Sequence, residues 1–164
     1  MINNAHWHVL LNHIPIIGVP MVAILLAWGI ARANDAMVRL ALVATVLMAG
    51  TAWLANFTGG RAEDEIKDAK YAWVSRDLIE EHEEAGDKSQ IAAIVTGVLA
   101  LGTLILARGG KSPHRTATLG VLLSLGTTAV LLGWTGWEGG KIRHNEFGVV
   151  TDSTALPAGA VPEP

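Results

Sequence analysis

Four long apolar segments dominate the chain, at residues 9–31, 37–57, 91–107 and 116–137. A helix needs about 20 residues to cross the ~30 Å hydrocarbon core of a bilayer. Backbone groups find no water inside lipid, so each segment must satisfy its hydrogen bonds within its own helix. The sequence therefore predicts an all-α fold, an integral membrane four-helix bundle.

The bundle is expected to form a single domain over residues 1–150. Residues 71–90 are polar but have helical propensity, so the third helix is predicted to span residues 71–107, with its first part outside the lipid. Glycine pairs at Gly59-Gly60 and Gly139-Gly140 are predicted to end the second and fourth helices, or to admit close approach of a ligand. Residues 151–164 are predicted to be a disordered tail.

Cations in the short loops set the expected orientation. Residues 32–39 and 108–115 together carry five Lys and Arg residues, and such loops stay on the cytoplasmic side. We therefore expect a multi-pass protein of the bacterial inner membrane, with both termini and the middle loop on the periplasmic side.

Five of the six histidines fall on that outer side, and ionisable residues at such positions usually face a bundle interior or a site. The exception is His114, which lies in an inner loop. The outer histidines are the candidate metal ligands: His6, His8, His13, His82 and His144.

A b-type haem is the first chemistry that this set could serve. It needs imidazoles from different helices with an apolar slot between them, and His82 could pair with either His8 or His13. Arg61, Lys141 or Arg143 could bind the propionates. The chain has no cysteine, which excludes iron–sulfur clusters, thiolate zinc sites and covalent CxxCH haem attachment.

Three other readings remain open. Imidazoles combined with Asp or Glu could hold Zn, Cu or Fe in a non-haem site. Histidine and glutamate near the interface could serve a quinone or proton-handling pocket. The histidines could also simply bond to backbone and headgroups with no ligand. A net charge of −3 without a basic patch gives no indication of nucleic-acid binding.

Several short motifs follow one another in a recognisable order. The matching residues are His8, His13 and Pro15, then Thr58-Gly59, then His82, then Gly139-Gly140-Lys141-Ile142 with Gly148-Val149. In this order they resemble a bacterial membrane-protein family catalogued as a domain of unknown function, the 2231 family. Val9 stands where that family has a proline, and Glu146 where it has a late histidine, with His144 two residues earlier. The resemblance implies a four-helix fold and a shared outer site. The family has no established activity, and a redox, haem-linked role is only suspected for it.

The predicted function is that of a haem-b-binding or electron-transfer membrane subunit, part of a larger respiratory or redox complex. The alternatives are a membrane anchor or assembly subunit without cofactor, and a non-haem metal-binding membrane protein. Residues 59–90 carry ten acids and five bases, so a basic c-type cytochrome or a neighbouring subunit is the expected partner. The run Glu80–Glu84 could equally be a solvated helix face.

Overall fold

The computed structural model describes residues 4–68 and 76–143, apart from the side chains of residues 5, 65–68 and 143. Within these ranges the chain forms four helices and no strand. They are α1 (Asn4–Ala31), α2 (Asp35–Asp68), α3 (Arg76–Leu106) and α4 (Arg115–Arg143). The predicted all-α four-helix fold is confirmed. The tail at 151–164 and the start of the third helix at 71–75 lie outside the described residues.

The helices are longer than the apolar segments from which they were predicted. α2 runs through Gly59 and Gly60 to Asp68, and α4 runs through Gly139 and Gly140 to Arg143. The prediction that these glycines end the helices is therefore wrong. An apolar run measures the part of a helix that lipid can cover, whereas good helix formers such as Glu63 continue the helix beyond it.

All four helices are long and apolar enough to cross a membrane. Many of their large apolar side chains point away from the bundle: Ile24 is 70% exposed, Leu123 76% and Val130 72%. Soluble monomers rarely expose contiguous apolar surface on this scale. The chain is therefore a multi-pass membrane protein whose outer surface is covered by lipid.

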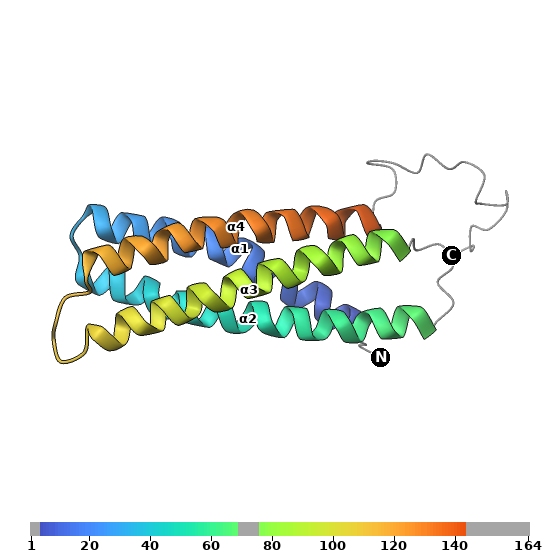
Figure 1. Ribbon diagram of the computed structural model, residues 1–164, viewed down its shortest axis with the longest axis horizontal. Helices are drawn as coiled ribbons and strands as arrows, with labels where there is room; N and C mark the ends of the chain where they lie inside the picture. Colours follow the sequence, from blue (N-terminus) through green and yellow to red (C-terminus); the bar gives the residue numbers. More distant parts are fainter. Residues whose placement is uncertain (1–3, 69–75, 144–164) are drawn as a thin grey trace.

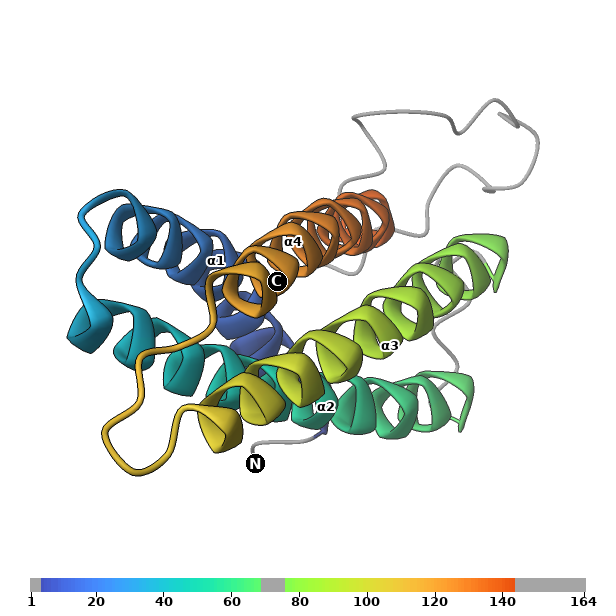
Figure 2. The same cartoon turned by 60° about the vertical axis from the view of Figure 1, so that its left-hand side comes forward.

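The helices lie lengthwise, with the two short loops at one end (Figures 1 and 2). The first residues of α1 and α3 and the last residues of α2 and α4 lie at the opposite end (Figure 1). We call these the short-loop end and the histidine end. The short-loop end is fastened by Arg39, whose Nη2 donates to the carbonyl of Ala107 at 3.0 Å and also to that of Lys111.

Each helix has two main neighbours. α1 packs against α2 and α4, and α3 packs against the same two helices. The helices α1 and α3 therefore occupy opposite corners of the bundle. Aliphatic side chains fill the centre, among them Val19, Leu26, Leu42, Val121 and Leu125.

The two hairpins, α1–α2 and α3–α4, repeat one pattern of burial. Buried residues of α1 have buried counterparts on α3 that lie 74 residues later in the chain. The pairs are Pro15 and Ser89, Val19 and Ala93, Val22 and Thr96, and Leu26 and Ala100. Those of α2 recur on α4 80 residues later: Val38 and Thr118, Ala41 and Val121, Thr45 and Leu125, Ala52 and Leu132. This is the arrangement expected of parallel repeats related by an axis along the membrane normal.

The second hairpin is held together by hydroxyl groups where the first uses aliphatic side chains. Thr96 Oγ1 of α3 lies 2.6 Å from Ser124 Oγ and 2.9 Å from Thr128 Oγ1, both on α4. Hydrogen bonds of this kind join helices inside membranes. On α1, the position that corresponds to Thr96 is Val22.

Candidate functional site

His8 is held on α1 by a hydrogen bond to the neighbouring helix. Its Nδ1 lies 2.9 Å from the carbonyl oxygen of Ala55 on α2. Gly59 lies one turn further along α2. The imidazole comes so close to the backbone there that a Cβ added at Gly59 would be only 2.9 Å from His8 Cε1. The missing side chain at Gly59 is what makes room for the ring.

His82 is held in the same way by the second hairpin. Its Nδ1 lies 3.0 Å from the carbonyl oxygen of Thr135 on α4, and a Cβ at Gly139 would stand 3.0 Å from His82 Cε1. Thr135 and Gly139 occupy the positions that correspond to Ala55 and Gly59, each 80 residues later. The repeat thus provides two matched half-sites, each made of one imidazole, one carbonyl and one glycine.

The two imidazoles meet although they come from opposite corners of the bundle. Their ring centroids are 5.9 Å apart and their planes differ by 76°. Both side chains are partly buried. Of the two pairings that the sequence left open, His82 with His8 or with His13, the fold brings together His82 and His8.

The carbonyl partners fix the chemistry that each ring can offer. A carbonyl oxygen can only accept a hydrogen bond, so Nδ1 carries the proton in both rings. In a neutral imidazole the lone pair is then on Nε2. Histidines that bind metals usually donate their other N–H to a carbonyl or carboxylate in this manner.

Of the other predicted ligands, the described part of the chain includes His6 and His13. His13 is exposed, and its Nδ1 lies 2.7 Å from the carbonyl oxygen of Val9 on its own helix. His6 is also exposed. His144 and the side chain of Arg143 lie outside the described residues. Across residues 4–68 and 76–143, no three His, Asp or Glu side chains are grouped so that they could hold a metal ion.

Arg61 lies at the rim of the same end of the bundle, two residues after Gly59. Its guanidinium carbon is 4.5 Å from the centroid of the Phe57 ring. A cation placed over an aromatic face in this way is attracted by the ring quadrupole. The contact holds the guanidinium beside Phe57 on an exposed face of α2. Residues two apart on a helix are about 200° apart around its axis, so this face points away from the contact between Gly59 and His8.

Sequence reasoning did not single out Glu138, although it is one of the most buried charged residues described. Only 6% of it is exposed. Its Oε1 accepts a hydrogen bond from Trp134 Nε1 at 2.9 Å, and its Oε2 lies 2.5 Å from Lys141 Nζ. Lys141 also reaches Glu81 of α3 at 3.5 Å. The spacing of Trp134, Glu138 and Lys141 at four and three residues could have indicated this cluster.

Asn12 is the second residue that the prediction left without a role. It lies one turn inward from His8, and its Oδ1 is buried without a hydrogen-bond partner among the described residues. A buried polar atom of this kind generally indicates a water molecule, an ion or a ligand. Asn12 Oδ1 is therefore an acceptor that water or a ligand can use, one turn along α1 from His8.

No protein-family model, curated protein or solved structure matches this chain. The resemblance to the 2231 family stays a prediction, and the function must be argued from the residues themselves.

Proposed function

We propose that the protein binds a b-type haem and transfers electrons as a membrane subunit, in which His8 and His82 would hold the iron. The observation that carries the proposal is the pair itself. Two partly buried imidazoles on different helices converge at the histidine end of the bundle, and each is oriented through Nδ1 so that Nε2 remains for a ligand. Imidazole nitrogens are among the protein ligands that hold haem iron.

The spacing of the two rings fits this use. Imidazole nitrogens bind metal ions at about 2.0–2.1 Å, so two rings that would hold one ion must lie close together with a nitrogen of each available. The centroids here are 5.9 Å apart. Asn12 Oδ1, one turn along α1 from His8, also supports the proposal because it is a buried acceptor without a hydrogen-bond partner among the described residues.

The haem would supply a one-electron couple between ferrous and ferric iron. The chain's own residues supply position. The carbonyls of Ala55 and Thr135 hold the rings in one tautomer, and Gly59 and Gly139 let them lie close to the backbone. Arg61, Arg143 and Lys141 are the proposed partners for the propionates.

The proposed partner is a basic c-type cytochrome or another subunit of a redox complex in a bacterial inner membrane, on the periplasmic side. Support comes from the acids at the histidine end. Glu80, Glu83 and Glu84 are exposed on the same helix as His82. Glu81 pairs with Lys141 and Glu84 with Lys88, which lowers the net negative charge of this face without removing it.

Absorbance of the purified protein tests the proposal. A reducible Soret band and a sharp α band are expected in the unaltered protein, and both should be lost in His8→Ala and in His82→Ala. His13→Ala is the matched control: it is a histidine on the same helix that does not reach the pair, and it should keep the spectrum. Normal haem binding in the His8 or His82 variant would overturn the ligand assignment.

A membrane anchor without cofactor is the second candidate, and one observation favours it. Both rings already bond to the backbone of a neighbouring helix, which by itself ties the histidine end together. Under this alternative the unaltered protein shows no haem band after expression with haem precursors. His8→Ala and His82→Ala then lower thermal stability alone.

A further inference from the structure

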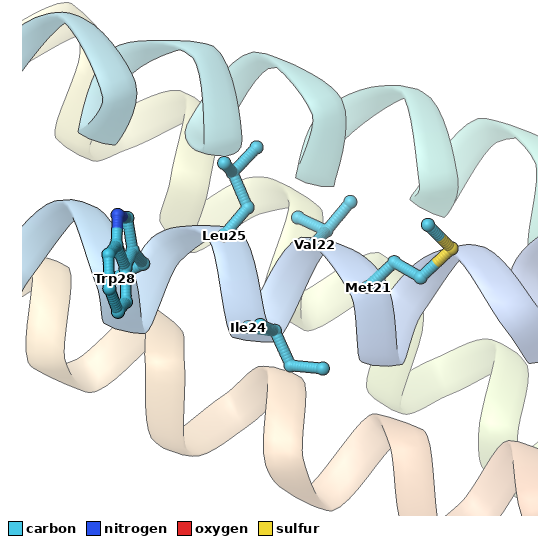
Figure 3. A pocket seen from close by; sticks show the side chains of 5 residues that line it. All are labelled: Met21, Val22, Ile24, Leu25 and Trp28. Atoms are coloured by element: carbon cyan, nitrogen blue, oxygen red, sulfur yellow. The ribbon is translucent and has the colours of Figure 1, made fainter.

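A shallow apolar groove runs along the outer side of α1, toward the short-loop end. It is lined by Met21, Val22, Ile24, Leu25 and Trp28, all from this one helix (Figure 3). Val22 is buried and forms part of the floor, whereas Met21, Ile24 and Trp28 are more than half exposed. In a membrane the groove opens toward the lipid chains.

A cation lies at the inner end of this groove. The guanidinium carbon of Arg32 is 5.4 Å from the centroid of the Trp28 ring. Trp is enriched where the hydrocarbon meets the headgroups, so Arg32 lies at headgroup depth. The short-loop end also carries an excess of positive charge, with five Lys and Arg residues in 32–39 and 108–115 against Asp35.

The length of the feature matches one leaflet. Arg32 and Met21 are eleven residues apart on the chain, which is about 16 Å along a helix at 1.5 Å per residue. Half of a ~30 Å hydrocarbon core is about 15 Å. The groove and its cation therefore cover the depth from a headgroup to the middle of the bilayer.

We propose that this groove binds an anionic phospholipid from the leaflet at the short-loop end. One acyl chain lies along Met21, Ile24 and Trp28, and the phosphate is bound by Arg32. Guanidinium groups bind phosphate through paired charge-assisted hydrogen bonds, and basic residues at a membrane surface attract anionic lipids.

The internal repeat provides a comparison within the same molecule. On α3, the positions that correspond to Met21, Trp28 and Arg32 are Val95, Gly102 and Leu106, each 74 residues later. The equivalent face of the second hairpin therefore has neither the ring nor the cation. We expect a single preferred lipid site, on the first hairpin.

Native mass spectrometry of the detergent-purified protein, titrated with phosphatidylglycerol or with phosphatidylcholine, tests this. One phosphatidylglycerol should be retained more strongly than the next, and phosphatidylcholine should show no such step. Arg32→Gln should weaken the first step about fivefold, the effect expected for one basic residue at a membrane surface. Arg108→Gln, which removes an exposed cation at the same end, should leave it unchanged.

A second variant tests the groove itself. Met21→Trp places a larger side chain in the half of the groove that lies farthest from Arg32. Because Met21 is exposed, the protein should keep its thermal stability but lose the preferential binding of the first phosphatidylglycerol. Equal effects of Arg32→Gln and Arg108→Gln, or equal binding of both lipids, would overturn the proposal and leave only general lipid contact. The result does not depend on haem, since His8→Ala should keep the lipid step.

Discussion

Gly59 of α2 lies against the imidazole of His8 of α1, so closely that an added Cβ would approach Cε1 to 2.9 Å. Gly139 lies against His82 in the same relation, at 3.0 Å. Both glycines are inside helices, where glycine costs about 0.5–1 kcal/mol relative to alanine. Because glycine stands at both matching positions of the repeat despite this cost, we infer that its role is to make room for the two rings.

Substitution of Gly59 and Gly139 gives the first prediction. Gly59→Ala and Gly139→Ala should each displace a ring and lower the thermal stability in detergent. Under the proposed haem binding, they should also weaken or shift the haem spectrum. Gly60→Ala and Gly140→Ala are the matched controls, because a Cβ at either position meets nothing within 4 Å. The controls should be neutral or stabilising by up to about 1 kcal/mol. Equal behaviour of all four variants would contradict the assigned role.

The hydroxyl cluster of the second hairpin gives the next prediction. Thr96→Val removes the partner of both Ser124 and Thr128 while keeping the shape of the side chain. Interhelical hydrogen bonds in membranes contribute about 0.6 kcal/mol on average and up to about 1.7, so a loss of about 1 kcal/mol is expected in reversible unfolding in mixed micelles. Thr127→Val, at an exposed position of α4, should change the free energy of unfolding by less.

Arg39 should matter for the short-loop end. Its guanidinium spans from α2 to the α3–α4 loop, where it binds the carbonyls of Ala107 and Lys111. Arg39→Met keeps the apolar stem and removes both bonds. Faster hydrogen exchange is expected in residues 108–114, with little change at the histidine end. Unaltered exchange in that loop would show that the bonds do not hold it.

Orientation can be measured directly. A reporter fused after Arg108 should behave as cytoplasmic and one fused after Pro164 as periplasmic, because cation-rich short loops stay inside. Alkaline phosphatase and green fluorescent protein fusions distinguish the two. The opposite result would place the histidine pair on the cytoplasmic side.

The acidic rim gives the last prediction. Reversing Glu80, Glu81, Glu83 and Glu84 to Lys should slow association with a basic c-type cytochrome at low salt. The effect should fade at high salt, since exposed charges are screened within about 8 Å at physiological ionic strength. Stopped-flow mixing at two salt concentrations measures both. Association that ignores salt and charge reversal alike would place docking elsewhere.

The four-helix fold was predictable because the lipid requirement acts on composition and length, which are visible in the chain. The ends of the second and fourth helices were not predictable, because Gly59 and Gly139 look like helix terminators. In the structure they lie inside the helices and make room for histidine side chains on other helices. The choice of His8 over His13 depends on how α1 is rotated about its axis, and five residues of separation place the two on different faces. The internal repeat could not be recognised in the sequence, because counterparts such as Val22 and Thr96 occupy the same structural position but have chemically different side chains.

Each hairpin contributes one histidine, so the pair can form only after both hairpins have entered the membrane. A hairpin that has just entered the bilayer already contains its own carbonyl and glycine, and can orient its ring without the other. The meeting of His8 with His82 must wait until the hairpins dock. A chain with only its first hairpin made would therefore present a single oriented imidazole, and any ligand that needs both rings could bind only after the second hairpin has docked.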